Sequence, residues 1–149
     1  MYHQVWINAP REKVFEGFST AEALSEWWEK HESTETPEGL VLSHDTGPAH
    51  GVVKQKVIDL VPNTRVEWEC VSKGHAMTSP ASAWPGTHVI WEISDRENRP
   101  EMTGFGKEGN RVTVLDFQHS GWDESSEFYG YCNSAWGEVL QMLKKWCEE

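Results

Sequence analysis

The chain has 149 residues and a formal net charge of −11, with 38% hydrophobic and 25% charged residues. This charge repels phosphate backbones and anionic membrane surfaces, so neither a nucleic-acid partner nor membrane insertion is expected. No apolar run approaches the roughly 18 residues of a membrane-spanning helix. A chain of this length is sufficient for one packed domain, which we expect to span 1–149.

The first predicted elements are a short strand and a bent pair of helices. Residues 5–7 predict the strand. A helix over 10–18 follows, and it begins with a proline, whose missing N–H is not needed at the first helical position. Ser19 and Glu22 have the spacing of a capping box, which predicts a second short helix over 20–28.

The middle of the chain predicts strands separated by polar turns. The polar stretch 31–50 is expected to hold at most one strand, at 40–43, and strands over 51–60, 65–72 and 87–94 follow. The last two alternate between apolar and polar residues, which indicates sheets buried on one face. The side chains expected to point inward are Val66, Trp68, Cys70, Val89, Trp91 and Ile93.

The chain closes with a strand over 111–119 and a long amphipathic helix over 124–147. Both faces of this strand are apolar, so its orientation stays open. Asp123 is expected to cap the helix. At 100° per residue, one apolar stripe of the helix contains Phe128, Cys132, Ala135, Val139, Met142, Leu143 and Trp146. The order of the elements predicts the α+β class.

Several segments in this order resemble a known superfamily. They read NAPREKVFEGFSTAEALSEWW, VIDLVPNTRVEWEC, THVIWEIS, GNRVTVLDFQHSGW and SAWGEVLQMLKKW. The chain resembles the SRPBCC superfamily, also called START-like or birch-pollen-allergen-like. Within it, the chain is similar to the domain that resembles the C-terminal part of the activator of the heat-shock protein 90 ATPase. The family often has Gly-Thr-Arg before the last strand, where this chain has Gly109, Asn110 and Arg111.

The resemblance implies a helix-grip fold, in which a bent antiparallel sheet wraps around the long C-terminal helix and two short helices follow the first strand. It also implies a cavity between sheet and helix for a small hydrophobic or amphipathic molecule. Indole N–H and phenol O–H groups would be its polar handles. The alternative is a filled core, which the sequence pattern does not distinguish from a hollow one. The residues expected to line the cavity and bind the ligand are Trp28, Trp68, Trp91, Phe117, His119, Phe128, Tyr131, Cys132, Ala135, Trp136 and Val139.

No catalytic constellation or metal site is predicted. His44, Asp45 and His50 could meet at a metal, but no histidine pair has a ligand spacing on a helix, and hydrogen-bonded histidines are the better interpretation. Cys132 and Cys70 fall on apolar faces, where a thiol is inert. No cofactor is implied.

Three functions follow as hypotheses. The first is a binding protein with an apolar cavity. The second is an enzyme of the polyketide cyclase or hydratase kind, which would need polar groups converging in the cavity; the candidates are Asp116, His119 and Tyr131. The third is a protein-interaction module resembling the chaperone activator, which would need an exposed apolar patch. Exposed strand edges would allow a homodimer.

The location of the protein is expected from its cysteines and its first residues. Three cysteines without close spacing do not form a disulfide framework, and residues 1–4 show no signal peptide. A cytoplasmic location with reduced thiols is therefore expected.

Overall fold

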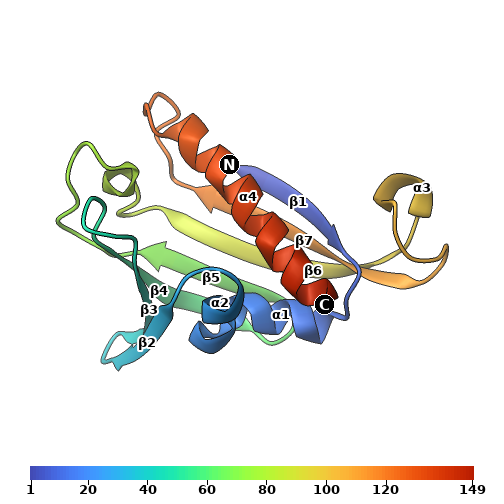
Figure 1. Ribbon diagram of the computed structural model, residues 1–149. Helices are drawn as coiled ribbons and strands as arrows, with labels where there is room; N and C mark the ends of the chain where they lie inside the picture. The colour runs from blue at the N-terminus through green and yellow to red at the C-terminus, as the bar shows by residue number, and fades with distance from the viewer.

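The computed structural model describes residues 1–149 and contains one bent antiparallel sheet of seven strands, with a long helix lying across it (Figure 1). The strand order is β1-β7-β6-β5-β4-β3-β2. The strands are β1 (Tyr2–Ile7), β2 (His31–Thr36), β3 (Gly39–Asp45), β4 (Val52–Val61), β5 (Arg65–Cys70), β6 (His88–Glu97) and β7 (Arg111–Ser120). The helices are α1 (Arg11–Ser19), α2 (Ala21–Trp27), the 3-10 helix η1 (Pro80–Ala83), α3 (Pro100–Thr103) and α4 (Tyr129–Glu148). The helix-grip arrangement is confirmed.

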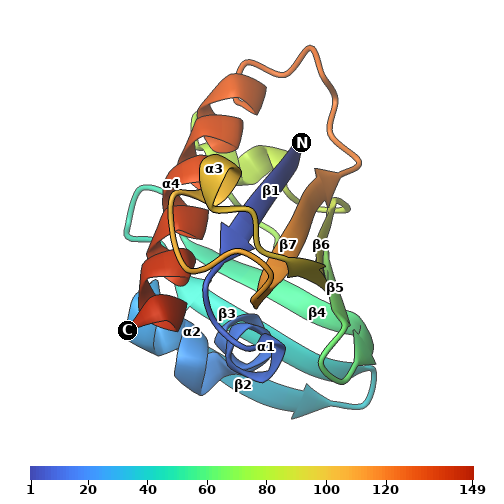
Figure 2. The ribbon, with the colours of Figure 1, turned by 90° about the vertical axis from the view of Figure 1, so that its right-hand side faces the viewer.

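The core lies between the concave face of the sheet and the helices. The view along the sheet shows the strands curling around α4, with α1 and α2 near the C-terminal end of that helix (Figure 2). A bulge between Val57 and Asp59 interrupts the β4–β5 register, and bulges bend the strand that carries them. The inward face predicted for β5 and β6 is confirmed, because all six of its side chains are buried. Phe18 of α1 stacks on Trp91 at a centroid distance of 5.3 Å.

Two predictions in the first third of the chain were wrong. Thr20, rather than Ser19, caps α2, since its hydroxyl accepts a hydrogen bond from the backbone N–H of Ala23 at 3.1 Å. The stretch 31–50 holds two strands instead of one, β2 and β3, which pair as a hairpin. β2 is the edge strand of the sheet, and only His31 is buried along it, so it lacks the apolar alternation that would have revealed it.

The last helix is shorter than predicted, and its buried face is rotated. α4 begins at Tyr129, and the Asp123 carboxylate instead accepts from the backbone N–H of Ser125, in the turn before the helix. Its buried residues are Cys132, Trp136, Leu140, Leu143 and Cys147. Met142, placed on the stripe by its hydrophobicity, is 42% exposed. Met142 lies at the edge of the predicted stripe that is farthest from the buried residues, because the buried face is rotated toward Leu140 and Cys147.

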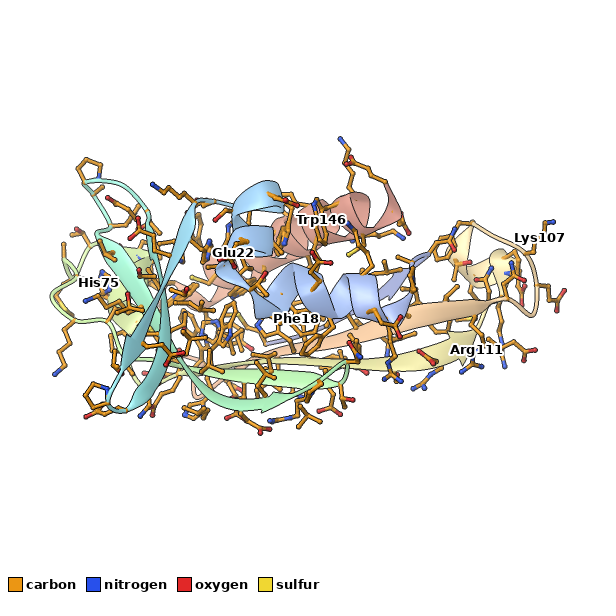
Figure 3. The ribbon with its side chains drawn as sticks, turned by 90° about the horizontal axis from the view of Figure 1, so that it is seen from below. Phe18, Glu22, His75, Lys107, Arg111 and Trp146 are labelled. Carbon is orange, nitrogen blue, oxygen red and sulfur yellow. The ribbon has the colours of Figure 1, made fainter.

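Helices α1 and α4 pack in close contact at Gly17. A Cβ at this position would lie 2.7 Å from Leu143 Cδ1 and 3.0 Å from the Trp146 ring. Figure 3 shows Trp146 of α4 on the far side of α1 from the sheet, while Phe18 points toward the strands. The carbonyl of Gly17 also accepts a 2.7 Å hydrogen bond from the indole of Trp27. A residue without a side chain is therefore needed where the two helices meet.

We expect Gly17→Ala to lower the free energy of unfolding by about 1–3 kcal/mol, because the fully buried Leu143 cannot move away from the added methyl group. Gly137→Ala is the matched control, since it lies inside α4 with only His3 Cε1 nearby, at 3.7 Å. It should raise stability by up to about 1 kcal/mol through helix propensity. Urea unfolding measures both, and an unchanged midpoint for Gly17→Ala would contradict the close contact.

Candidate functional site

A cavity of about 260 Å³ lies between the N-terminal half of α4, the strands β3 and β4 and the loop around η1. It is partly open to solvent. Its apolar and aromatic wall consists of Trp28, Val53, Pro80, Ala81, Trp84, Tyr131, Cys132, Ala135, Trp136 and Val139. Its polar residues are Glu29, His44, Thr46 and His50. The lining contains no lysine or arginine.

Trp136 is the central residue of the aromatic wall. Its ring stacks on that of Trp84 at a centroid distance of 5.7 Å, and the Trp28 ring is tilted against it at 5.5 Å. α4 supplies Trp136, the loop after η1 supplies Trp84, and the end of α2 supplies Trp28. Three elements that are distant in sequence therefore each contribute an indole ring to the wall of the same cavity.

A chain of buried hydrogen bonds fixes this wall. The Trp136 indole N–H donates to His119 Nδ1 at 3.0 Å, which assigns the imidazole proton to Nε2. His119 Nε2 then donates to the Thr87 hydroxyl at 2.7 Å, and that hydroxyl donates to the Trp84 carbonyl at 2.6 Å. Burial lowers the pKa of His119 to about 3, so the ring is neutral at physiological pH. The side-chain polar atoms of Trp136, His119 and Thr87 all have partners, whereas Trp84 takes part only through its carbonyl and its buried indole N–H has no partner.

The polar end of the cavity is formed by His44 and Glu29. His44 Nε2 lies 3.8 Å from Glu29 Oε2, whereas His44 Nδ1 is buried and has no hydrogen-bond partner. His44 pairs in register with His31 of β2, and their rings stack at 4.5 Å. Burial, together with His31, lowers the pKa of His44 to about 3. Burial and the nearby Asp45 raise the pKa of Glu29.

His50 connects the two loops at this end of the molecule. Its Nδ1 lies 2.7 Å from the hydroxyl of Ser79, and its carbonyl lies 2.6 Å from His75 Nδ1. Figure 3 places His75 at the end of the protein opposite Lys107 and Arg111. The loops 46–51 and 73–86 are thus held together beside the cavity.

The structure brings six of the eleven predicted site residues to the cavity wall: Trp28, Tyr131, Cys132, Ala135, Trp136 and Val139. It places the other five elsewhere. Trp68, Trp91 and Phe117 are buried in the core, His119 is enclosed and bonded to Trp136, and Phe128 precedes α4. Sequence reasoning missed the contributions of Glu29, His44, Thr46, His50, Val53, Pro80, Ala81 and Trp84. The only sequence features that could have indicated these lining residues were the histidines within 31–50 and the Trp-Pro-Gly run at 84–86.

The three acid–base candidates do not converge in the cavity. Asp116 lies on the opposite face of β7 from His119, where it accepts hydrogen bonds from the Tyr2 hydroxyl and from Gln4 Nε2. Only Tyr131 borders the cavity, and it is 65% exposed. No group of three or more His, Cys, Asp or Glu side chains is arranged to hold a metal ion. His44, Asp45 and His50 therefore do not form a metal site. Burial raises the pKa of the Cys132 thiol.

A bent sheet that grips a C-terminal helix around a lined cavity defines a protein of the SRPBCC type. The chain belongs to the family described as activator of Hsp90 ATPase homolog 1-like protein, whose sequence model matches residues 8–148. No curated protein matches the chain.

Many solved structures are similar to this chain, and three of them show the extent of the likeness. The Aha1 dimer from Colwellia psychrerythraea is 26% identical, with a TM-score of 0.72 over 99% of this chain and 95% of that one. CalU16 from Micromonospora echinospora is 14% identical, with a TM-score of 0.67 over 98% and 74%. MLL2253 from Mesorhizobium loti is 16% identical, with a TM-score of 0.64 over 98% and 94%.

One solved relative gives an indication about assembly, and the helices give one about the membrane. The Colwellia relative is a dimer, whereas a homodimer or a chaperone complex of the present chain stays a prediction. None of the helices combines the length and the apolar character that crossing a bilayer requires.

We expect Trp136→Phe to lower the free energy of unfolding by about 1–3 kcal/mol, because it leaves His119 Nδ1 buried without a donor. Trp6→Phe is the control, since it removes an indole hydrogen bond to Gln4 in an exposed setting and should cost under about 1 kcal/mol. Urea midpoints compare the two. Equal losses would contradict a structural role for the buried chain of hydrogen bonds.

Stability should fall as the pH drops below about 6.5. The folded-state pKa values of His44 and His119 are near 3, against 6.5 when unfolded, so the unfolded chain binds more protons between these limits. For each of the two histidines, the free energy of unfolding should fall by about 1.4 kcal/mol for every pH unit of acidification in this window. His31 acts in the same direction. Unfolding at pH 7.5, 6 and 5 measures the slope, and His44→Phe should reduce it; a variant with the slope of the unmodified protein would refute the assignment to His44.

Proposed function

We propose that the chain binds a small apolar or amphipathic molecule in the cavity between α4 and the sheet. The observation that supports this function is the cavity itself, whose wall is aromatic and aliphatic on most sides and polar only at the end formed by Glu29, His44 and His50. An apolar molecule that replaces water there gains the free energy of burying its surface. The cavity volume of about 260 Å³ restricts the ligand to a small compound.

The wall is held ready for a ligand. Trp136 and Trp84 belong to the hydrogen-bonded chain through His119, and Trp28 packs against both Trp27 and Trp136. Side chains that are already fixed lose little conformational entropy when a ligand arrives, which favours affinity from a small contact area. This arrangement supports binding to a preformed site.

Binding is better supported than the other two hypotheses. A cyclase or hydratase would need acid–base groups converging on the ligand, and neither Asp116 nor His119 lines the cavity. His44 does line it, but burial lowers its pKa to about 3, which makes its imidazole a weak base. An adaptor would need an outer apolar patch, and the exposed apolar residues nearest this description are Ile58, Leu60 and Val61 on β4. They occupy a short length of one strand, which is less than such a patch requires.

A titration with the uncharged dye N-phenyl-1-naphthylamine tests the proposal. We expect saturable binding near one site per chain, accompanied by a change in tryptophan emission. Val139→Trp fills the cavity from α4 and should abolish binding while the protein stays folded. Met142→Trp is the matched control on the same helix, because Met142 is exposed and does not line the cavity, and it should bind as before. Undiminished binding by folded Val139→Trp would place the dye elsewhere and contradict the proposal.

A further inference from the structure

The polar end of the cavity has an unfilled hydrogen-bonding arrangement. His44 is 5% exposed, its Nδ1 has no partner, and its Nε2 stands 3.8 Å from Glu29 Oε2. That separation is too long for a direct hydrogen bond. Both residues line the cavity. A buried imidazole and a carboxylate therefore face each other across a gap at the one polar part of an otherwise apolar site.

The surroundings of His44 assign its proton. The negative charge of Glu29 favours an N–H over a lone pair on the nearer imidazole nitrogen, so the partnerless Nδ1 is the unprotonated nitrogen. The proton is then on Nε2, which lies toward the Glu29 carboxylate. His44 thus offers a donor and Glu29 an acceptor, close enough together for one polar atom beside them in the cavity to reach both.

Few chemical groups satisfy both partners at once. A hydroxyl can accept from His44 Nε2–H through its oxygen and donate its proton to Glu29. A carbonyl can accept but leaves the carboxylate unpaired, and an ammonium cannot accept. A carboxylate is repelled by Glu29 and by a chain of net charge −11, and the cavity has no lysine or arginine to compensate.

We propose that the cavity selects uncharged ligands that carry a hydroxyl group, with His44 and Glu29 as the residues that determine this specificity. The inference rests on the proposed function and names the ligand class of the same cavity. The apolar body of such a ligand would lie against the indoles, since the Trp28 ring is 5.0 Å from the His44 ring and 5.5 Å from the Trp136 ring. An aromatic ring with one hydroxyl matches the indole wall and the polar pair together.

Three probes of similar size test the inference at pH 7.5: naphthalene, 2-naphthol and 2-naphthoate. Their dissociation constants are measured by displacement of N-phenyl-1-naphthylamine from the full chain. We expect 2-naphthol to bind about 10-fold more tightly than naphthalene, in line with one or two hydrogen bonds to a charged or buried partner. We expect 2-naphthoate to bind at least about 10-fold more weakly than 2-naphthol.

Two variants separate the roles of the pair. His44→Phe keeps an aromatic ring against Trp28 and should erase the preference for 2-naphthol while naphthalene still binds. Glu29→Gln removes the repulsive charge and should improve binding of 2-naphthoate. Its control is Glu22→Gln, which removes a negative charge from α2 outside the cavity (Figure 3). This control should leave the dissociation constants of all three probes unchanged. Glu29 is half exposed, so its variant does not depend on a tolerant core.

The outcomes distinguish this inference from the proposed function. Equal affinities for naphthalene and 2-naphthol in the unmodified protein would overturn the inference and leave the binding function standing. A preference for 2-naphthol that survives in His44→Phe would overturn the role of His44, and binding of 2-naphthoate that does not improve in Glu29→Gln would overturn the role of Glu29. If neither the dye nor any probe binds, the proposed function fails and the inference falls with it.

Discussion

The hydrogen bond from the Trp136 indole to His119 is the interaction on which the rest of the site depends. It joins the middle of α4 to the end of β7, and through Thr87 it continues to the backbone of Trp84. The imidazole must stay neutral to accept this bond, and its burial ensures that it does. A single histidine thereby sets the position of the helix over the sheet and holds the loop after η1 that completes the cavity wall.

The cavity exists because small side chains meet where the rest of the core is filled by large ones. Ala135 of α4, Ala81 of η1 and Val53 of β4 line it. Beyond them, Trp68, Trp91 and Phe117 fill the space under the helix completely. The β2–β3 hairpin forms one end of the curled sheet (Figure 2). From this end His44 of β3 reaches the cavity, which is apolar on most sides and polar at one end.

The sequence predicted the parts of the fold that have a regular pattern of burial. The orientations of β5 and β6 were predicted correctly. Each strand has one face toward the core and one toward solvent, so apolar and polar residues alternate along it. The edge strand β2 escaped notice because it has almost no buried side chain. The site was predicted only where α4 and Trp28 contribute to it. Its polar end depends on the register that places His44 beside His31 and near the end of α2, and no local pattern encodes a long-range register.

The hydrogen bonds that fix the fold and those available to a ligand come from different groups in this protein. The only hydrogen-bond donor of the Trp136 indole is bonded to His119. The indole therefore presents a flat apolar face to the cavity and no free donor. Directional contacts come instead from His44 of β3 and from the loop residues Glu29 and His50, and loops tolerate substitution more readily than packed elements. Under the proposed binding function, relatives built on the same framework could exchange one small molecule for another by changing a few residues at the cavity, without refolding the core. Diversity of ligands within one architecture follows from this division.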